Sequence, residues 1–214
     1  MALIGICAAA AAMPLTFTGP AVALPAISRD LGGSPIALNW VTNAFMLTFG
    51  SSLMASGALA DSYGRKRIFL MGLVAFLLFS AGLAFAPDIV WFDVLRALQG
   101  MGAAAAFSGG MAALAQEFDG NARMRAFSIV GSSFGVGLAF GPIASGFMFD
   151  SLDWPAIFAL IVGQGVIAFV IGSIFLHEKR DPEAKVHDWP CATVFSQTWE
   201  LCSYVVRRAR VQVV

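Results

Sequence analysis

The sequence predicts an all-α membrane protein with six transmembrane helices. Of its 214 residues, 58% are hydrophobic and only 12% are charged, whereas a soluble globular domain carries about 25% charged residues. Apolar runs of about 20 residues, the length that crosses a bilayer, recur six times along the chain. Spanning segments must be helical because lipid offers no hydrogen-bond partner to free backbone groups.

The predicted spans, in chain order, cover residues 3–25, 40–60, 68–86, 92–114, 126–148 and 155–176. No basic residues precede the first apolar run, as they would in a secretory signal, so we expect this run to remain as a helix. We therefore expect residues 1–176 to form a six-helix transmembrane bundle. Residues 177–214 are polar and basic, and are expected to form a cytoplasmic linker and an atypical tail.

The positive charges predict how the helices are oriented. On one side of the six spans the connections carry a single basic residue, Arg29, and on the other side they carry eleven. The thirteenth basic residue, Arg96, falls inside a predicted span. Because positively charged loops stay in the cytoplasm, both termini are predicted to be cytoplasmic.

Between the second and third spans lies the compact polar block GALADSYGRKR, residues 57–67. Gly57 is expected to allow close helix packing, and Gly64 the sharp reversal that a short loop requires. Asp61 can accept backbone N–H groups or cap a helix, while Arg65 and Lys66 hold the loop in the cytoplasm. The alternative is a loop that sets orientation only, for which any basic cluster would serve.

The fourth span carries Arg96, Gln99 and Gly100 on one helix face. Counted along the helix, Arg96 lies only about 8 Å below the outer surface. An intramembrane arginine is by default a functional candidate that faces a cavity or a partner. At this depth it could equally extend back to the surface, so both interpretations stay open.

The fifth span carries small residues at helical spacing together with a proline. Gly137 and Gly141 are four residues apart, and Gly146 follows, which favours close helix packing. Pro142 removes a backbone hydrogen bond and can bend the helix. Packing alone would explain each glycine taken singly.

These three blocks, in this order, resemble the signature motifs of the Major Facilitator Superfamily of secondary transporters. Two further stretches, ALPAI at residues 23–27 and WVTNAFMLTFG at residues 40–50, resemble the drug:proton antiporter branch, especially its fourteen-helix group. The resemblance implies one half of the facilitator fold, built from two inverted three-helix repeats. It also implies a conformational gating role for residues 57–66, proton coupling through Arg96, and an antiporter motif in the fifth helix. Ser62, Ser145 and Thr16 depart from the pattern, since an arginine, a glycine and an aspartate are usual there.

The resemblance implies proton-coupled efflux of a drug-like or metabolite molecule across the plasma membrane by alternating access. Small molecules, protons and the lipid bilayer are the implied partners, without a cofactor, metal or nucleic acid. The abrupt change in composition near Cys191 raises an alternative. The chain could be a truncated or frame-diverged half-transporter that is inactive, or one that assembles with a second half or a second copy.

Other membrane classes lack their required residues, and we expect no enzyme activity. Both histidines, His177 and His187, follow the last span, which excludes an intramembrane serine protease. The chain has no phosphate-binding Gly-x-x-x-x-Gly-Lys loop for an ATP-driven pump. It also lacks the paired Asn-Pro-Ala segments of a water channel.

Overall fold

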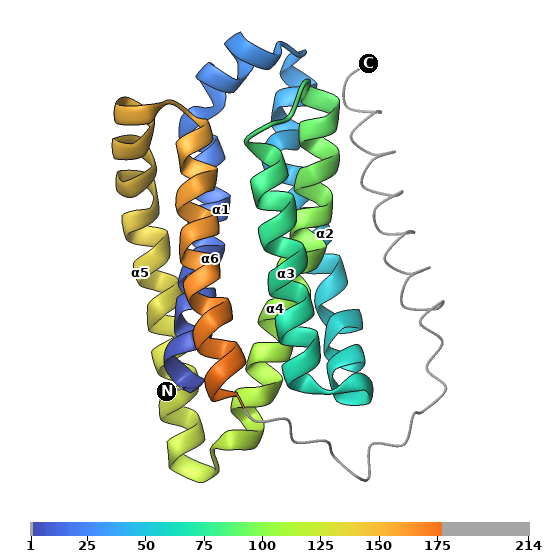
Figure 1. The fold of residues 1–214 in the computed structure, drawn as a ribbon, viewed down its shortest axis with the longest axis vertical. Coiled ribbons are helices and arrows are strands. Elements are labelled where there is room, and N and C mark those ends of the chain that lie inside the picture. Colours follow the sequence, from blue (N-terminus) through green and yellow to red (C-terminus); the bar gives the residue numbers. More distant parts are fainter. Residues whose placement is uncertain (1, 177–214) are drawn as a thin grey trace.

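The computed structural model describes residues 2–176, which form six helices in a roughly parallel bundle (Figure 1). The helices are α1 (Ala2–Leu31), α2 (Pro35–Tyr63), α3 (Arg65–Leu83), α4 (Ile89–Glu117), α5 (Gly120–Leu152) and α6 (Pro155–Phe175). Each predicted span falls on its own helix, so the all-helical fold class is confirmed. The expected linker and tail lie outside the described residues.

Several helices begin before the apolar run that predicted them, because local capping determines where they start. The Ser34 hydroxyl accepts a hydrogen bond from the Ala37 N–H at 3.3 Å, and α2 begins at the proline between them. The Asp88 carboxylate accepts from the Trp91 N–H at 2.8 Å at the start of α4. Such caps satisfy backbone donors that the helix cannot, independently of membrane depth.

Four of the six helices are apolar and long enough to cross a membrane by composition alone: α1, α3, α5 and α6. The other two helices, α2 and α4, have sufficient length but are less apolar. Their sequences contain more polar side chains, including Asn39 and Asn43 in α2 and Arg96 and Gln99 in α4.

The helices form two groups joined by α3 and α6 (Figure 1). α4 packs along α2 and α3, while α1 packs along α5 and α6. If α1, α2 and α3 are exchanged for α4, α5 and α6, the contacts of α4 with α2 and α3 become those of α1 with α5 and α6. That exchange symmetry is the arrangement of the inverted repeats common in transporter folds.

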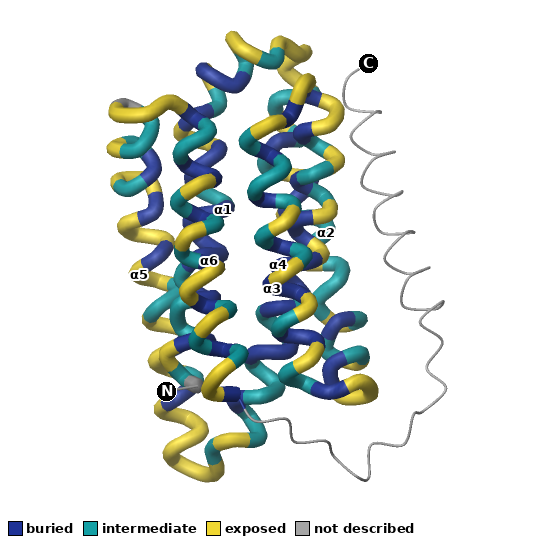
Figure 2. The backbone as a smooth tube through the Cα atoms, in the orientation of Figure 1, coloured by how far each residue is buried: buried dark blue, intermediate teal, exposed yellow. Residues whose placement is uncertain are grey.

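Buried residues concentrate on α1 and on the inward faces of α3 and α4, whereas much of α5 is exposed (Figure 2). Aromatic rings fill the middle of the bundle, where Phe17 of α1 contacts Phe45 and Phe49 of α2 and Phe134 of α5. A second aromatic group, Phe92, Trp154 and Phe158, closes the end that holds the α3–α4 and α5–α6 connections.

Candidate functional site

The connection between α2 and α3 is a single residue, Gly64, with φ 108° and ψ 128°. Residues with a side chain rarely adopt this region, so glycine is required for so abrupt a turn. The Gly64 N–H bonds the Ala60 carbonyl at 3.1 Å, and its own carbonyl accepts from Ile68 at 3.1 Å. The reversal expected at Gly64 is thus present.

Asp61 pairs with Arg65 rather than capping a helix as we expected. Asp61 Oδ1 accepts from Arg65 Nε at 3.0 Å and from Nη2 at 2.9 Å, and the N-terminus of α3 has no side-chain cap. The two residues stand four apart on either side of Gly64. Residues four apart can lie on the same side of the chain, so the Arg65 guanidinium is within reach of the Asp61 carboxylate.

Arg65 and Lys66 also bind the ends of other helices. Arg65 Nη1 donates to the carbonyl of Ala112 near the end of α4 at 3.2 Å. Lys66 Nζ donates to the carbonyl of Ser173 in the last turn of α6 at 2.9 Å. Cations are favoured at helix C-termini, where carbonyls are unpaired and the helix dipole is negative. The loop between α2 and α3 therefore also holds the ends of α4 and α6, besides carrying positive charge.

Gly57 does not pack closely within this bundle, contrary to expectation. A Cβ atom placed on Gly57 would meet no heavy atom of the described residues within 4 Å. The reason is that this side of α2 faces outward, away from α3 and α4. Gly131 and Gly135 of α5 are open in the same way.

Arg96 is completely buried in the interior of the bundle. Its Nε donates to the Val41 carbonyl at 2.8 Å, its Nη1 to Gln99 Oε1 at 2.7 Å, and its Nη2 to the Thr16 carbonyl at 3.0 Å. The guanidinium carbon lies 4.6 Å from the ring centroid of Phe45, a favourable position for a cation. The alternative in which this side chain reaches the outer surface is therefore wrong.

The Thr16 carbonyl is available to Arg96 because of Pro20, four residues later in α1. In a helix this carbonyl would accept from the N–H of residue 20, but proline has none. Arg96 Nη2 supplies the missing donor. The sequence contains this signal, since a proline within a helix identifies a free carbonyl four residues earlier.

Gln99 extends the hydrogen-bond network from α4 into α3. Its Nε2 donates to Ser80 Oγ at 2.6 Å, and the Ser80 hydroxyl donates to the Phe76 carbonyl at 2.6 Å. Gln99 and Ser80 are both fully buried. The network of Thr16, Val41, Ser80, Arg96 and Gln99 thus connects four helices, and we call it the Arg96 network. Sequence reasoning missed Ser80 and Val41.

Gly100 brings α4 close enough to α2 for this network to form. A Cβ atom on Gly100 would lie 2.6 Å from the Phe45 carbonyl oxygen and would also collide with the Thr48 hydroxyl. Only glycine therefore fits, because any side chain would push the two helices apart. The Val41 carbonyl that Arg96 binds lies one turn away along the same face of α2.

The glycines of the α5 motif divide into two kinds. A Cβ atom on Gly137 would lie 2.6 Å from the Ala11 carbonyl oxygen, and one on Gly141 would lie 2.6 Å from Thr18 Oγ1, so both pack against α1. Gly146 has open space beside it, and Pro142 is exposed. The helix continues through Pro142 to its end. Part of the motif therefore packs within the bundle and part faces outward.

Asp93, which the sequence places at the edge of its span, lies one turn before Arg96. Its Oδ1 is shielded from solvent and has no hydrogen-bond partner among the described residues. No group of three or more His, Cys, Asp or Glu side chains within residues 2–176 could hold a metal ion.

Six long helices, four of them apolar enough to cross a membrane, packed around buried polar groups are the architecture of an integral, multi-pass membrane protein. The chain belongs to the Major Facilitator Superfamily, which it matches over residues 4–202. Many solved structures share its fold, among them a peptide transporter POT in complex with sulfate and the human organic anion transporter MFSD10.

The POT structure superposes with a TM-score of 0.73 at 14% identity, over 99% of this chain and 46% of that one. The MFSD10 structure superposes with a TM-score of 0.62 at 18% identity, over 90% of this chain and 51% of that one. The described bundle therefore corresponds to one half of a facilitator fold.

Two curated relatives are named for drug resistance or efflux. The puromycin resistance protein pur8 of Streptomyces alboniger is 39% identical over 153 residues, which are 71% of this chain and 30% of that protein. The multidrug efflux pump LfrA of Mycolicibacterium smegmatis is 34% identical over 179 residues, 83% of this chain and 35% of the pump. The chain thus spans about a third of the length of these relatives.

Proposed function

We propose that the chain forms one half of a proton-coupled exporter of small drug-like or metabolite molecules, working by alternating access with a second six-helix half. Family membership supports transport, and the efflux and resistance proteins among the relatives support export. The observation that carries the proposal is the Arg96 network. It buries a permanent cation among neutral dipoles, a costly arrangement that membrane proteins keep where function requires it.

In this proposal Arg96 and Gln99 take part in proton coupling, with Gly100 holding α4 against α2. Arg96 stabilises a carboxylate in its ionised form and releases it when the hydrogen bonds rearrange. Thr16 stands where the related antiporters carry an aspartate, so the protonatable group of this chain must lie elsewhere. Asp93 is the nearest carboxylate on the same helix.

The α2–α3 loop is proposed to act as the conformational gate. Asp61, Gly64, Arg65 and Lys66 hold the ends of α2, α3, α4 and α6 together, so the bundle can move as one body. Gly57 presents an open surface beside this loop. The same reasoning gives Pro142 and Gly146 of α5 a place at the interface with the second half.

We place the protein in the plasma membrane with both termini in the cytoplasm. The support is the distribution of positive charge, with eleven basic residues on one side and Arg29 alone on the other. The substrate would then cross from the cytoplasmic side, which holds the α2–α3 loop, to the outer side, which holds the α1–α2 connection. The coupling protons would move in the opposite direction.

A second candidate function is a half-transporter that does not transport by itself. It is motivated by the described bundle, which superposes on one half of a facilitator fold. Such a half would be inactive, or would assemble with a full-length partner or with another copy of itself.

Transport by reconstituted vesicles separates the two candidates. The chain is incorporated into everted vesicles alone, and together with the remaining part of LfrA expressed separately. Uptake of a broad panel of drugs and dyes is then measured with and without an imposed proton gradient, against Arg96→Ala vesicles. Gradient-dependent uptake supports the exporter. Uptake at the Arg96→Ala level in both preparations leaves only the non-transporting half.

A further inference from the structure

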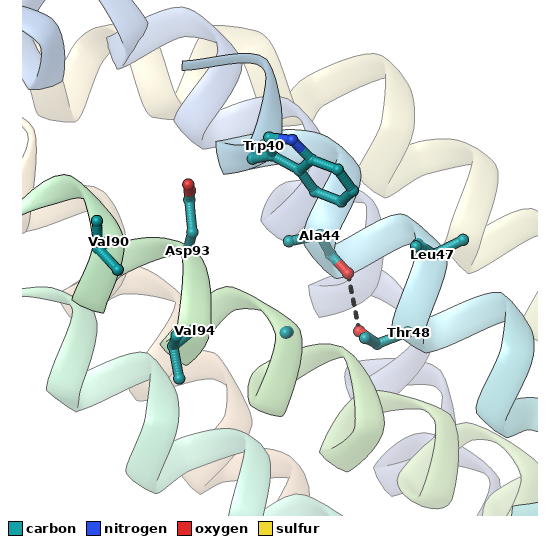
Figure 3. A pocket seen from close by; sticks show the side chains of 8 residues that line it. Trp40, Ala44, Leu47, Thr48, Val90, Asp93 and Val94 are labelled. Atoms are coloured by element: carbon teal, nitrogen blue, oxygen red, sulfur yellow. Dashed lines mark hydrogen bonds between the residues drawn. The ribbon is translucent and has the colours of Figure 1, made fainter. Parts of the chain in front are cut away.

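A pocket opens between α2 and α4, near the end of the bundle where α4 begins (Figure 3). Its volume is about 340 Å³, which lies at the small end of the range for ligand sites, roughly 300 to 1,000 Å³. Trp40 and Thr48 line it from α2, and Asp93, Val94 and Ala97 from α4.

Asp93 is the only charged side chain among the residues that line this pocket. Its Oδ1 is shielded from solvent and accepts no hydrogen bond from the described residues. Arg96 is three residues away and attracts the carboxylate, but its printed hydrogen bonds go to Val41, Gln99 and Thr16. A buried carboxylate oxygen without a donor is costly, so this site favours a ligand that brings a positive charge.

The remaining surface of the pocket is almost entirely apolar. Trp40 extends over the opening from α2, while Asp93 and Val94 stand on α4 opposite (Figure 3). An indole ring is the aromatic surface that attracts cations most strongly. Thr48 donates its hydroxyl proton to the Ala44 carbonyl at 2.9 Å, so it offers a ligand only an acceptor. The pocket therefore combines a negative charge, an aromatic face and an acceptor within apolar walls.

We propose that the α2–α4 pocket binds an organic cation, a protonated amine carried on a small apolar body. Asp93 provides the opposite charge, Trp40 covers the ligand, and Val94 and Ala97 contact its apolar part. The site lies wholly within the described bundle and needs neither transport nor a second half. Its failure would therefore leave the proposed function standing, and the reverse also holds.

Direct binding to the chain in lipid nanodiscs tests this site. The probe is 4-phenylbutylamine, which is cationic at neutral pH, and the comparison ligand is 4-phenylbutanol, which has the same shape without the charge. Isothermal titration calorimetry should show one saturable site for the amine. Because an ion pair in an apolar pocket contributes strongly to binding, we expect the alcohol to bind at least about tenfold more weakly.

Two variants locate the site and one serves as a matched control. Asp93→Asn removes the charge at constant size and should weaken amine binding at least about tenfold. Ala97→Phe fills the pocket while keeping the carboxylate, and should abolish binding. Asp88→Asn alters an exposed carboxylate at the start of the same helix, where asparagine remains a good cap, and should bind as the wild type does.

The proposal is overturned if the alcohol binds as tightly as the amine, or if Ala97→Phe binds the amine normally. It is also overturned if folded Asp93→Asn binds the amine as tightly as the wild type does. Circular dichroism and thermal unfolding confirm that each variant folds. Should Asp93→Asn fail to fold, Ala97→Phe and the alcohol still decide the question.

Discussion

At the scale of single residues, the most informative side chain is Arg96. Its three hydrogen bonds go to two backbone carbonyls and one amide, at 2.7 to 3.0 Å. The planar guanidinium reaches all three at once, whereas a lysine ammonium is a point charge on a flexible stem. The geometry of the group therefore matters as much as its charge.

The first prediction separates geometry from charge at this position. Arg96→Lys keeps the positive charge but leaves hydrogen-bond acceptors unpaired. We therefore expect the free energy of unfolding to fall by about 1–3 kcal/mol. Proton-driven uptake should decrease at least about tenfold. Arg29→Lys, an exposed residue at the end of α1, is the control and should change neither quantity. If Arg96→Lys were as stable and as active in uptake as Arg29→Lys, the positive charge alone would be sufficient at position 96.

The second prediction concerns Pro20, which frees the carbonyl that Arg96 binds. Pro20→Ala restores an N–H that competes for the Thr16 carbonyl, so we expect proton-driven uptake to fall although α1 becomes a better helix. Pro25→Ala, in the same helix, is the matched control because Arg96 does not bind the carbonyl that it frees. Uptake that falls equally in both would point to helix shape instead of the Arg96 network.

At the scale of helices, the turn between α2 and α3 depends on one backbone conformation. Gly64→Ala should destabilise the protein by about 1–3 kcal/mol, since a side chain is strained at φ 108°. Gly50→Ala in the interior of α2 has open space and normal helical geometry. It should leave stability unchanged or raise it slightly. Thermal unfolding in detergent measures the stability of both variants. If Gly50→Ala were destabilised as Gly64→Ala is, the strained turn at Gly64 would not explain the loss.

The contact between α1 and α5 is tested by two glycines that are two residues apart. Gly137→Ala places a Cβ atom against the Ala11 carbonyl, whereas Gly135→Ala places it in open space. We expect Gly137→Ala to lower the unfolding temperature and Gly135→Ala to leave it unchanged. If both variants were equally stable, α5 would be able to move away from α1 without cost.

At the scale of the whole molecule, the open faces of α2 and α5 point outward from the described bundle. Gly57→Trp and Gly131→Trp should leave the stability of this chain unchanged, because nothing described lies within 4 Å of either position. Combined with the remaining part of LfrA, the same variants should abolish uptake by preventing the two halves from meeting. Retained uptake in both would show that these faces contact lipid.

The fold was largely predictable because the bilayer imposes simple rules. About 20 apolar residues must form a helix, and each predicted span indeed lies on one helix. The boundaries were less predictable, since Ser34 and Asp88 start their helices through local hydrogen bonds. The lower hydropathy of α2 and α4 was not anticipated, because each is long enough to span a bilayer. Their polar side chains are exposed in α2, at Asn39 and Asn43, and buried in α4, at Arg96 and Gln99.

The candidate site was only partly predictable. Gly64 was identified correctly, since a one-residue turn requires glycine. The partners of Arg96 were not, because its acceptors lie 55 and 80 residues away and depend on how the helices rotate. The pairing of Asp61 with Arg65 was not anticipated although the two residues are four apart, because Gly64 interrupts the helix between them.

Arg96 meets α1 and α2 through main-chain oxygens, which has a consequence for how this family varies. A carbonyl is present whatever side chain the residue carries. Substitution at positions 16 and 41 can therefore leave the arginine fully paired. The bond from Arg96 to position 16, for example, does not depend on the Thr16 hydroxyl, which donates to the Ala12 carbonyl instead. Evolution could alter the chemistry beside the arginine without rebuilding its support.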